Sequence, residues 1–226
     1  MIRQIPLPLP HEAAMGADDY LVTPSNREAA SWIDKWPHWP AHGLVVSGLS
    51  GSGKTHLLNL WLAKSGGRLI TLQELLTQDA ATLCARSAKI AIDNIDALAG
   101  NAPAEEALFH LYNHLKSSLG SLLVTLSRGV GLSGFRLPDL RSRLLTLPVA
   151  SLGAPDDDLL AALIVKQFRD RQIDLDAGVV TYLLPRMPRD AAGIRELVEK
   201  LDQAGLAEGR KISVALAKKA LESGDA

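Results

Sequence analysis

The 226-residue sequence contains a single cysteine, Cys84. One cysteine excludes a disulfide framework and an all-cysteine zinc site, and it fits a reducing compartment. No apolar run approaches the roughly 20 residues that a membrane-spanning helix needs, and the first residues lack the pattern of a signal peptide. These absences predict a cytoplasmic protein with no membrane partner.

Neither sign of charge is in excess. Lys and Arg total 24, Asp and Glu total 25, and the formal net charge is −1. A chain this close to neutral has no bulk electrostatic attraction to nucleic acid, so DNA binding would need a local basic patch. Hydrophobic residues make up 47% of the chain, which is enough for a core and excludes a disordered protein.

Short apolar runs alternate with helical patterns over the first two thirds of the chain. The expected strands are residues 43–48, 68–72, 88–93 and 121–127, and the expected helices are 26–36, 56–64, 72–78 and 104–119. This alternation predicts βαβ units around a parallel sheet that is buried on both faces. Asn26 is placed to act as the N-cap of the first helix.

Only helical patterns remain after about residue 151. They cover residues 155–172, 176–184, 190–205 and 213–223, and Gly205 is placed like a C-cap glycine. Prolines at positions 6, 8 and 10 predict an extended arm at the start of the chain. We therefore expect an arm over residues 1–17, an α/β domain over 18–151 and a small all-α domain over 152–226.

A phosphate-binding pattern lies between the first expected strand and the helix after it. Residues 48–55, GLSGSGKT, fit GxxxxGK[ST], in which backbone N–H groups turn inward around phosphates. Lys54 can neutralise the β and γ oxygens, and the Thr55 hydroxyl can ligate Mg²⁺. The expected nucleotide contacts are Gly48, Ser50, Gly51, Ser52, Gly53, Lys54, Thr55 and His56.

An acidic residue follows the apolar run at residues 90–92. Asp93 would present its carboxylate to Mg²⁺ from the end of that strand. The next residue is Asn94, which cannot accept a proton from an attacking water. We therefore expect a nucleotide with Mg²⁺, and only weak ATP hydrolysis by this chain alone.

Arginine is concentrated in residues 128–143, which hold four arginines, one acid and no lysine. A solvated basic loop fits this composition. An arginine finger, a guanidinium offered to a γ-phosphate across a subunit contact, fits it as well. Arg195 leaves a similar choice between a surface pair with Glu199 and a contact with the nucleotide.

Four segments, SGLSGSGKTHLL, IAIDNID, LPDLRSRL and GIRELVEKLD, resemble in this order the AAA+ module of the bacterial replication initiator DnaA. The resemblance covers roughly residues 18–222. It implies a P-loop AAA+ fold, in which a parallel sheet flanked by helices precedes a small helical lid, with the nucleotide at their junction. It also implies an arginine finger at Arg143 and a sensor II role for Arg195. Tyr20, Leu21 and Val22 match the segment with which the family contacts adenine. Thr125 and Ser127 match the sensor I region, and Ser127 stands where the family usually has an aspartate.

The segment QIPLPL at residues 4–9 resembles the hexapeptide with which proteins dock on the sliding clamp, the β subunit of DNA polymerase III. Gln4 can form a hydrogen bond at one edge of a cleft that Ile5, Leu7 and Leu9 fill, and the prolines lower the ordering cost. We expect no DNA-binding domain after the lid. Together these features resemble the Hda type of DnaA-related regulator.

That resemblance implies a negative regulator of replication initiation. A clamp-bound protein of this type stimulates, in trans, the hydrolysis of ATP bound to DnaA, with Arg143 as the catalytic contribution and its own ADP or ATP as a structural element. DNA is reached only indirectly, and head-to-tail homo-oligomers are geometrically available. The alternatives are a DnaA-related helicase loader that binds a replicative helicase and single-stranded DNA, and a self-contained ATPase, against which Asn94 argues. Three tryptophans can either pack over the sheet edge or stack on single-stranded DNA: Trp32, Trp36 and Trp39.

Overall fold

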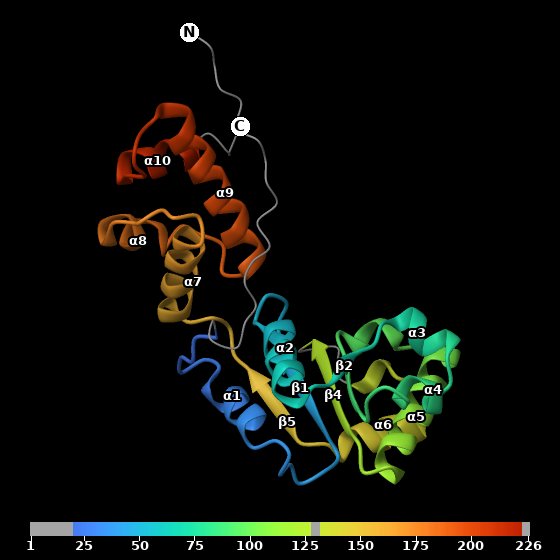
Figure 1. The fold of residues 1–226 in the computed structure, drawn as a ribbon. Helices are drawn as coiled ribbons and strands as arrows, with labels where there is room; N and C mark the ends of the chain where they lie inside the picture. The colour runs from blue at the N-terminus through green and yellow to red at the C-terminus, as the bar shows by residue number, and fades with distance from the viewer. Residues whose placement is uncertain (1–19, 128–131, 223–226) are drawn as a thin grey trace.

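The structure is a computed structural model that describes residues 20–127 and 132–222 (Figure 1). Five parallel strands form one sheet in the order β2-β3-β4-β1-β5. The strands are β1 (Gly43–Gly48), β2 (Arg68–Leu69), β3 (Lys89–Ile92), β4 (Ser121–Ser127) and β5 (Val149–Leu152). Because all five run the same way, their carboxyl ends lie at one edge of the sheet. The predicted parallel α/β fold is confirmed.

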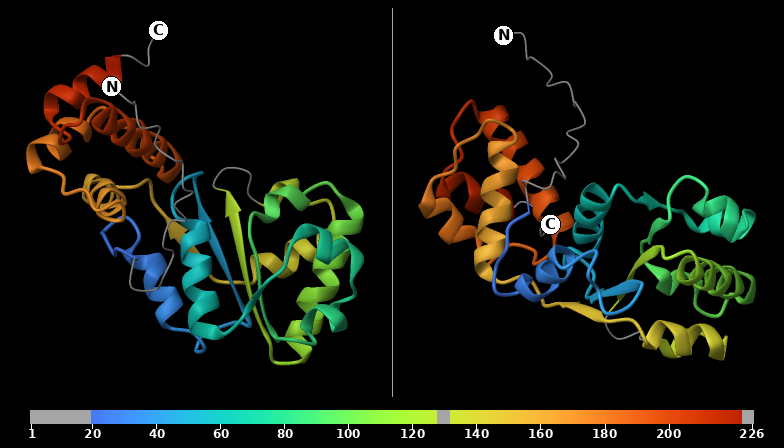
Figure 2. Two further views of the ribbon diagram at one scale, coloured as in Figure 1. Left: turned by 45° about the horizontal axis from the view of Figure 1, so that its top comes forward. Right: turned by 60° about the horizontal axis from the view of Figure 1, so that its bottom comes forward.

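Helices cover both faces of the sheet. Figures 1 and 2 show α1 and α2 on one side and α3 to α6 on the other. The helices are α1 (Arg27–Asp34), α2 (Lys54–Ser65), α3 (Leu72–Thr77), α4 (Ala80–Cys84), α5 (Ala102–Ser117) and α6 (Pro138–Leu145). Strand residues alternate between the two layers: Leu44 and Val46 lie in the cluster with α1 and α2, whereas Val45 lies in the cluster with α5 and α6.

The lid consists of α7 (Asp157–Arg169), α8 (Ala177–Leu183), α9 (Ala191–Glu208) and α10 (Val214–Glu222). Its apolar side chains form a core of their own, separate from the two clusters around the sheet. Asp156 caps α7 by accepting a hydrogen bond from the backbone N–H of Leu159 at 2.8 Å, as the acidic start of this segment predicts. Within the described residues, no helix has the length and apolarity needed to cross a bilayer.

Several local predictions were wrong. The expected strand at 68–72 is only two residues long, because Thr71 and Glu74 form a capping box that starts α3. Gly205 lies inside α9, whose C-cap is Gly209 with a left-handed φ of 61°. Asn26 stands at the N-cap position of α1, but its side chain bonds to the Thr23 N–H and the Leu21 carbonyl, each at 2.8 Å.

The tryptophans that precede β1 belong to the core beside α2. Trp39 stacks on Trp61 with ring centroids 5.8 Å apart, and Trp36 meets Trp61 edge-on at 6.2 Å. The Trp39 indole N–H donates to the carbonyl of Trp32 at 2.6 Å. This arrangement favours packing over a stacking platform for single-stranded DNA.

Candidate nucleotide-binding site

The phosphate-binding loop connects the end of β1 to the start of α2. Gly51 and Gly53 have left-handed φ angles of 73° and 95°, which only glycine adopts without strain. The first backbone N–H groups of α2 have no partner within the helix, and they lie where the loop closes. The Lys54 ammonium donates to the carbonyls of Gly48 and Leu49, both at 2.9 Å, so it lies across the loop it belongs to.

A chain of hydrogen bonds joins the loop to the carboxyl-terminal parts of β3 and β4. The Thr55 hydroxyl donates to Asp93 Oδ2 at 2.7 Å, and the Thr125 hydroxyl donates to the other carboxylate oxygen, Oδ1. The Thr125 oxygen in turn accepts the backbone N–H of Asn94 at 2.7 Å. The chain thus links the start of α2, the residues after β3 and the carboxyl-terminal half of β4, and Thr55 and Asp93 are adjacent as the predicted Mg²⁺ pair requires.

The two sensor I candidates differ in how they meet this chain. Thr125 is fully buried, and its side chain contacts Asp93 directly. Ser127 donates its backbone N–H to Asp96 Oδ2 at 2.6 Å. Asp96 was assigned no role from the sequence, because the expected strand at 88–93 does not indicate how the chain turns after Asp93. Instead β3 ends at Ile92, Asn94 adopts a φ of 55°, and a 3₁₀ turn (Ile95–Leu98) carries Asp96 to the end of β4.

The candidate adenine segment lies against the start of α2. The Tyr20 ring is 5.2 Å from the His56 ring between centroids, and burial raises the pKa of Tyr20 to about 12. Leu21 and Val22 are 40% and 54% exposed, which leaves apolar surface for a ligand. Side chains of this segment, of α1 and of α2 together line a groove of about 410 Å³.

The same segment is joined to the beginning of the lid. The backbone N–H of Ser25 donates to Asp156 Oδ2 at 3.1 Å, and Gly153 N–H donates to the Ser25 carbonyl at 3.2 Å. Burial would raise the pKa of Asp156, but hydrogen bonds from the Leu159 and Ser25 N–H groups outweigh it and hold the pKa below its usual value. Hydrogen bonds therefore link the segment with the expected adenine contacts to the start of the lid.

The lid reaches the phosphate loop through the beginning of α9. Asp190 caps this helix through the N–H groups of Ala192 and Gly193, and a Cβ added to Gly51 would collide with the Cβ of Asp190. Arg195 is exposed on the same helix. Glu199 lies 3.8 Å from Arg171, so the acid considered as a surface partner of Arg195 faces another arginine.

Arg143 lies at the other edge of the sheet. It is exposed in the last turn of α6, which leads into β5, and Val149 at the start of β5 pairs with Val45 of β1. β1 then runs to Gly48, where the phosphate loop begins (Figure 1). From Val45 to Gly48 the strand advances by about 10 Å, at about 3.3 Å per residue. Arg143 precedes Val149 in the chain and therefore lies toward the amino ends of the strands, away from the phosphate loop.

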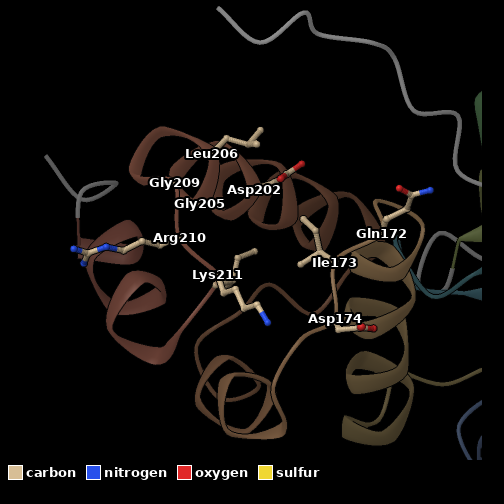
Figure 3. A pocket seen from close by; sticks show the side chains of 10 residues that line it. Gln172, Ile173, Asp174, Asp202, Gly205, Leu206, Gly209, Arg210 and Lys211 are labelled. Atoms are coloured by element: carbon tan, nitrogen blue, oxygen red, sulfur yellow. The ribbon is translucent and has the colours of Figure 1, made fainter. Parts of the chain in front are cut away.

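Other predicted features lie apart from this site. The candidate clamp-binding residues Gln4, Ile5, Leu7 and Leu9 are outside the described residues. A pocket of about 590 Å³ opens in the lid between the α7–α8 connection and the C-terminal part of α9 (Figure 3). Its lining includes Ile173, Asp202 and Lys211 but none of the predicted nucleotide contacts.

The residues around the loop fit a nucleotide and its metal ion. The buried Ser52 hydroxyl has no hydrogen-bond partner among the described residues, and Gly48 leaves no room for a side chain against it. No three His, Cys, Asp or Glu side chains within the described ranges gather closely enough to hold a metal ion. Mg²⁺ would therefore be held by Thr55, Asp93, phosphate oxygens and water, which is the usual ligand set of this ion beside a nucleotide.

Comparison with known proteins found similarities to both parts of the chain. Residues 156–221 match the family described as "Hda, lid domain". Domain III of DnaA from Thermotoga maritima superposes with a TM-score of 0.78 at 22% identity, over 95% of this chain and 98% of that one. AMPPCP-bound DnaA from Aquifex aeolicus gives a TM-score of 0.68 at 17% identity, over 84% and 66% of the two chains.

A relative of nearly the same length was also found. An uncharacterised protein of Haemophilus influenzae strain Rd is 27% identical over 243 residues, which span 98% of this chain and 99% of that protein. The structural matches share the fold of this chain, and the family match is confined to the helical domain. The helical domain thus resembles the Hda lid family, and the whole chain has the fold of DnaA domain III.

Proposed function

We propose that this chain is a negative regulator of replication initiation that stimulates the hydrolysis of DnaA-bound ATP. In this proposal it docks on the polymerase III sliding clamp through residues 4–9, in the cytoplasm, and holds ADP or ATP with Mg²⁺ in its own site. The arm is residues 1–17, the AAA+ domain 18–151 and the lid 152–226. DNA is reached through the clamp and through DnaA.

The observation that carries the proposal is the position of Arg143. Arg143 is exposed in the last turn of α6, before the amino end of β5, whereas the phosphate loop follows the carboxyl end of β1. This supports a role on a nucleotide other than the one that the same chain binds. An arginine in this position is available to a nucleotide presented by a second AAA+ module. The Hda-type lid and the DnaA-like fold make DnaA the partner that fits this role best.

The chemistry asked of Arg143 is electrostatic. When water attacks the γ-phosphorus of the partner's ATP, the bond from that phosphorus to the β–γ bridging oxygen breaks, and ADP and phosphate leave. Negative charge spreads over the transferred group during this step, and a planar guanidinium can stabilise it with two parallel hydrogen bonds. The chain's own site contains Asn94 after Asp93, which supports a structural role for its own nucleotide.

The test is the turnover of DnaA-bound ATP with and without this chain and clamp-loaded DNA. We expect faster turnover only when both are present. A variant with Leu7→Ala and Leu9→Ala should lose clamp binding and, with it, the stimulation. If that variant retained both clamp binding and stimulation, the clamp-docking role of residues 4–9 would be wrong. Stimulation by the chain without any clamp would leave the finger role intact but remove the tether.

A further inference from the structure

Glu105 is a buried carboxylate in the first turn of α5 with no exposed surface. Its Oε1 accepts the backbone N–H groups of Gly100 at 2.6 Å and Arg136 at 3.1 Å. Its Oε2 accepts those of Arg136 at 2.9 Å and Leu137 at 2.6 Å. A buried charge is costly unless it is compensated, and here main-chain donors from two different segments compensate it.

One of these segments begins the helix that carries Arg143. Leu137 is the N-cap of α6, and its side chain has no oxygen with which to cap the helix. The next residue is Pro138, which has no N–H to donate. The Glu105 carboxylate therefore receives the N–H groups at the entrance to α6 and takes over part of the task that a capping side chain usually performs.

The other constraints on α6 are apolar packing and, at its C-cap, a hydrogen bond of 3.2 Å between the hydroxyls of Thr146 and Tyr112. α6 is eight residues long, which is too short for a helix to be stable without tertiary contacts. Two of its side chains, Leu140 and Leu144, are buried, and they fix the face of the helix that lies against the core. α5 and α6 lie side by side (Figure 1), so Glu105 adds directional bonds at the start of α6 to this apolar contact.

We propose that Glu105 is a positioning residue that holds the entrance of α6 and thereby orients Arg143. Arg143 follows Leu137 by six residues, or about 9 Å along a helix, so a tilt at the entrance displaces the guanidinium. The proposal rests on the proposed function, in which Arg143 acts on a partner's nucleotide. Gly100, the third partner, follows the 3₁₀ turn that carries Asp96, so the same carboxylate also links this loop to α6.

The ionised form of Glu105 is the one that its surroundings favour. Burial would raise its pKa, but the N–H groups of Leu137, Arg136 and Gly100, together with the Arg136 charge, outweigh burial and hold the pKa below its usual value. The four hydrogen bonds therefore persist at neutral pH. A neutral amide at this position would place an NH₂ group against backbone donors and would lose part of the set.

The experiment compares Glu105→Gln with Glu106→Gln, which removes the same charge from the exposed neighbouring residue. Three quantities are measured: ADP binding by calorimetry, the saturated rate of DnaA-bound ATP turnover, and the concentration of the chain that gives half of this rate. Misplacing a catalytic group by about 1 Å costs up to 100-fold in rate, so we expect a roughly 10- to 100-fold fall in the saturated rate for Glu105→Gln. ADP affinity and the half-saturating concentration should stay within about threefold of wild type, because neither depends on an interaction that is made only in the transition state.

Hydrogen exchange gives a readout that does not depend on the partner. The amides of Arg136 and Leu137 should be protected in the wild type and in Glu106→Gln, and should exchange faster in Glu105→Gln. Glu105→Asp keeps the charge but withdraws the carboxylate by one methylene. This second variant should fold even if Glu105→Gln does not, with an intermediate saturated rate.

The outcomes separate this proposal from the one it rests on. Folded Glu105 variants that reach the saturated rate of Glu106→Gln would overturn the positioning role while leaving the proposed function in place. If the wild type failed to stimulate, or Arg143→Ala stimulated as well as the wild type, the finger role would fall and the positioning role with it.

Discussion

Single hydroxyl and carboxylate groups organise the phosphate site. Asp93 accepts a hydrogen bond from Thr55 on one oxygen and from Thr125 on the other, so one carboxylate aligns the loop with two strands. Lys54 lies on the carbonyls of Gly48 and Leu49, 2.9 Å from each, and can turn from them to phosphate oxygens. The site is thus preassembled, with a lysine whose present partners are replaceable.

Replacing Lys54 with alanine should weaken nucleotide binding. Charge-assisted hydrogen bonds contribute about 1.5–3 kcal/mol, which corresponds to a roughly 10- to 100-fold rise in the dissociation constant for ADP. Isothermal titration measures this directly. Lys218→Ala, an exposed lysine in α10, is the control and should bind as the wild type does. Equal affinities for both variants would argue against a phosphate contact by Lys54.

The contribution of Glu105 to the free energy of unfolding should decrease at acidic pH. Its pKa is lower in the folded chain than the usual value of about 4.3 for an unfolded one, so its contribution is complete above that pH. As the pH falls through the folded-state pKa, this contribution is lost. In urea unfolding, the difference between the wild type and Glu105→Gln should be constant from pH 6 to 8, at about 1.5–3 kcal/mol, and should shrink at pH 3. A difference that stayed unchanged at pH 3 would mean that the charge has no part in it.

At the scale of elements, local patterns predicted what local physics determines. The apolar run before GLSGSGKT and the helix after it depend on neighbouring residues, and both were predicted correctly. β5 was not predicted, because it is a four-residue edge strand in which only Ala150 and Leu152 are buried. The burial of Glu105 depends on α6, which is more than 30 residues away in the chain. One local signal was present: Glu105 lies three residues before the apolar Leu108 and so shares its face of the helix.

The end of α9 was predicted at Gly205, four residues too early. Gly205 and Gly209 are both candidates for a C-cap, and the structure uses Gly209, at which an added Cβ meets nothing within 4 Å. Gly205 instead lies beside Ile212 of the lid core, so the helix continues past it. Tertiary packing, and not the local sequence, therefore places the C-cap of α9 at Gly209.

Replacing Gly209 with alanine should therefore destabilise the lid for conformational reasons only. The left-handed φ of 61° disfavours any residue with a Cβ, and the expected cost is about 1 kcal/mol. Gly209→Asn should cost less, because asparagine tolerates this region better. Thermal unfolding followed by circular dichroism measures both. A Gly209→Ala protein as stable as the wild type would contradict the assigned C-cap.

For the whole molecule, the common direction of the strands separates the phosphate loop from Arg143. The carboxyl ends of the strands hold the phosphate loop, with the start of α9 against it, and the opposite edge holds Arg143. No short-range pattern gives this separation, because it follows from the strand order and from the parallel course of β5 beside β1. This separation supports the proposal that the protein binds one nucleotide and presents Arg143 to another.

The most direct test of this account is the saturated turnover of DnaA-bound ATP with Arg143→Ala. Arg141→Ala is the matched control, because Arg141 is exposed on the same helix but lies about 200° around it from Arg143. We expect Arg143→Ala to reduce the saturated rate at least roughly 1000-fold, within the range known for arginine fingers, while ADP and clamp binding stay unchanged and Arg141→Ala retains the rate. Wild-type stimulation by Arg143→Ala would contradict the central claim.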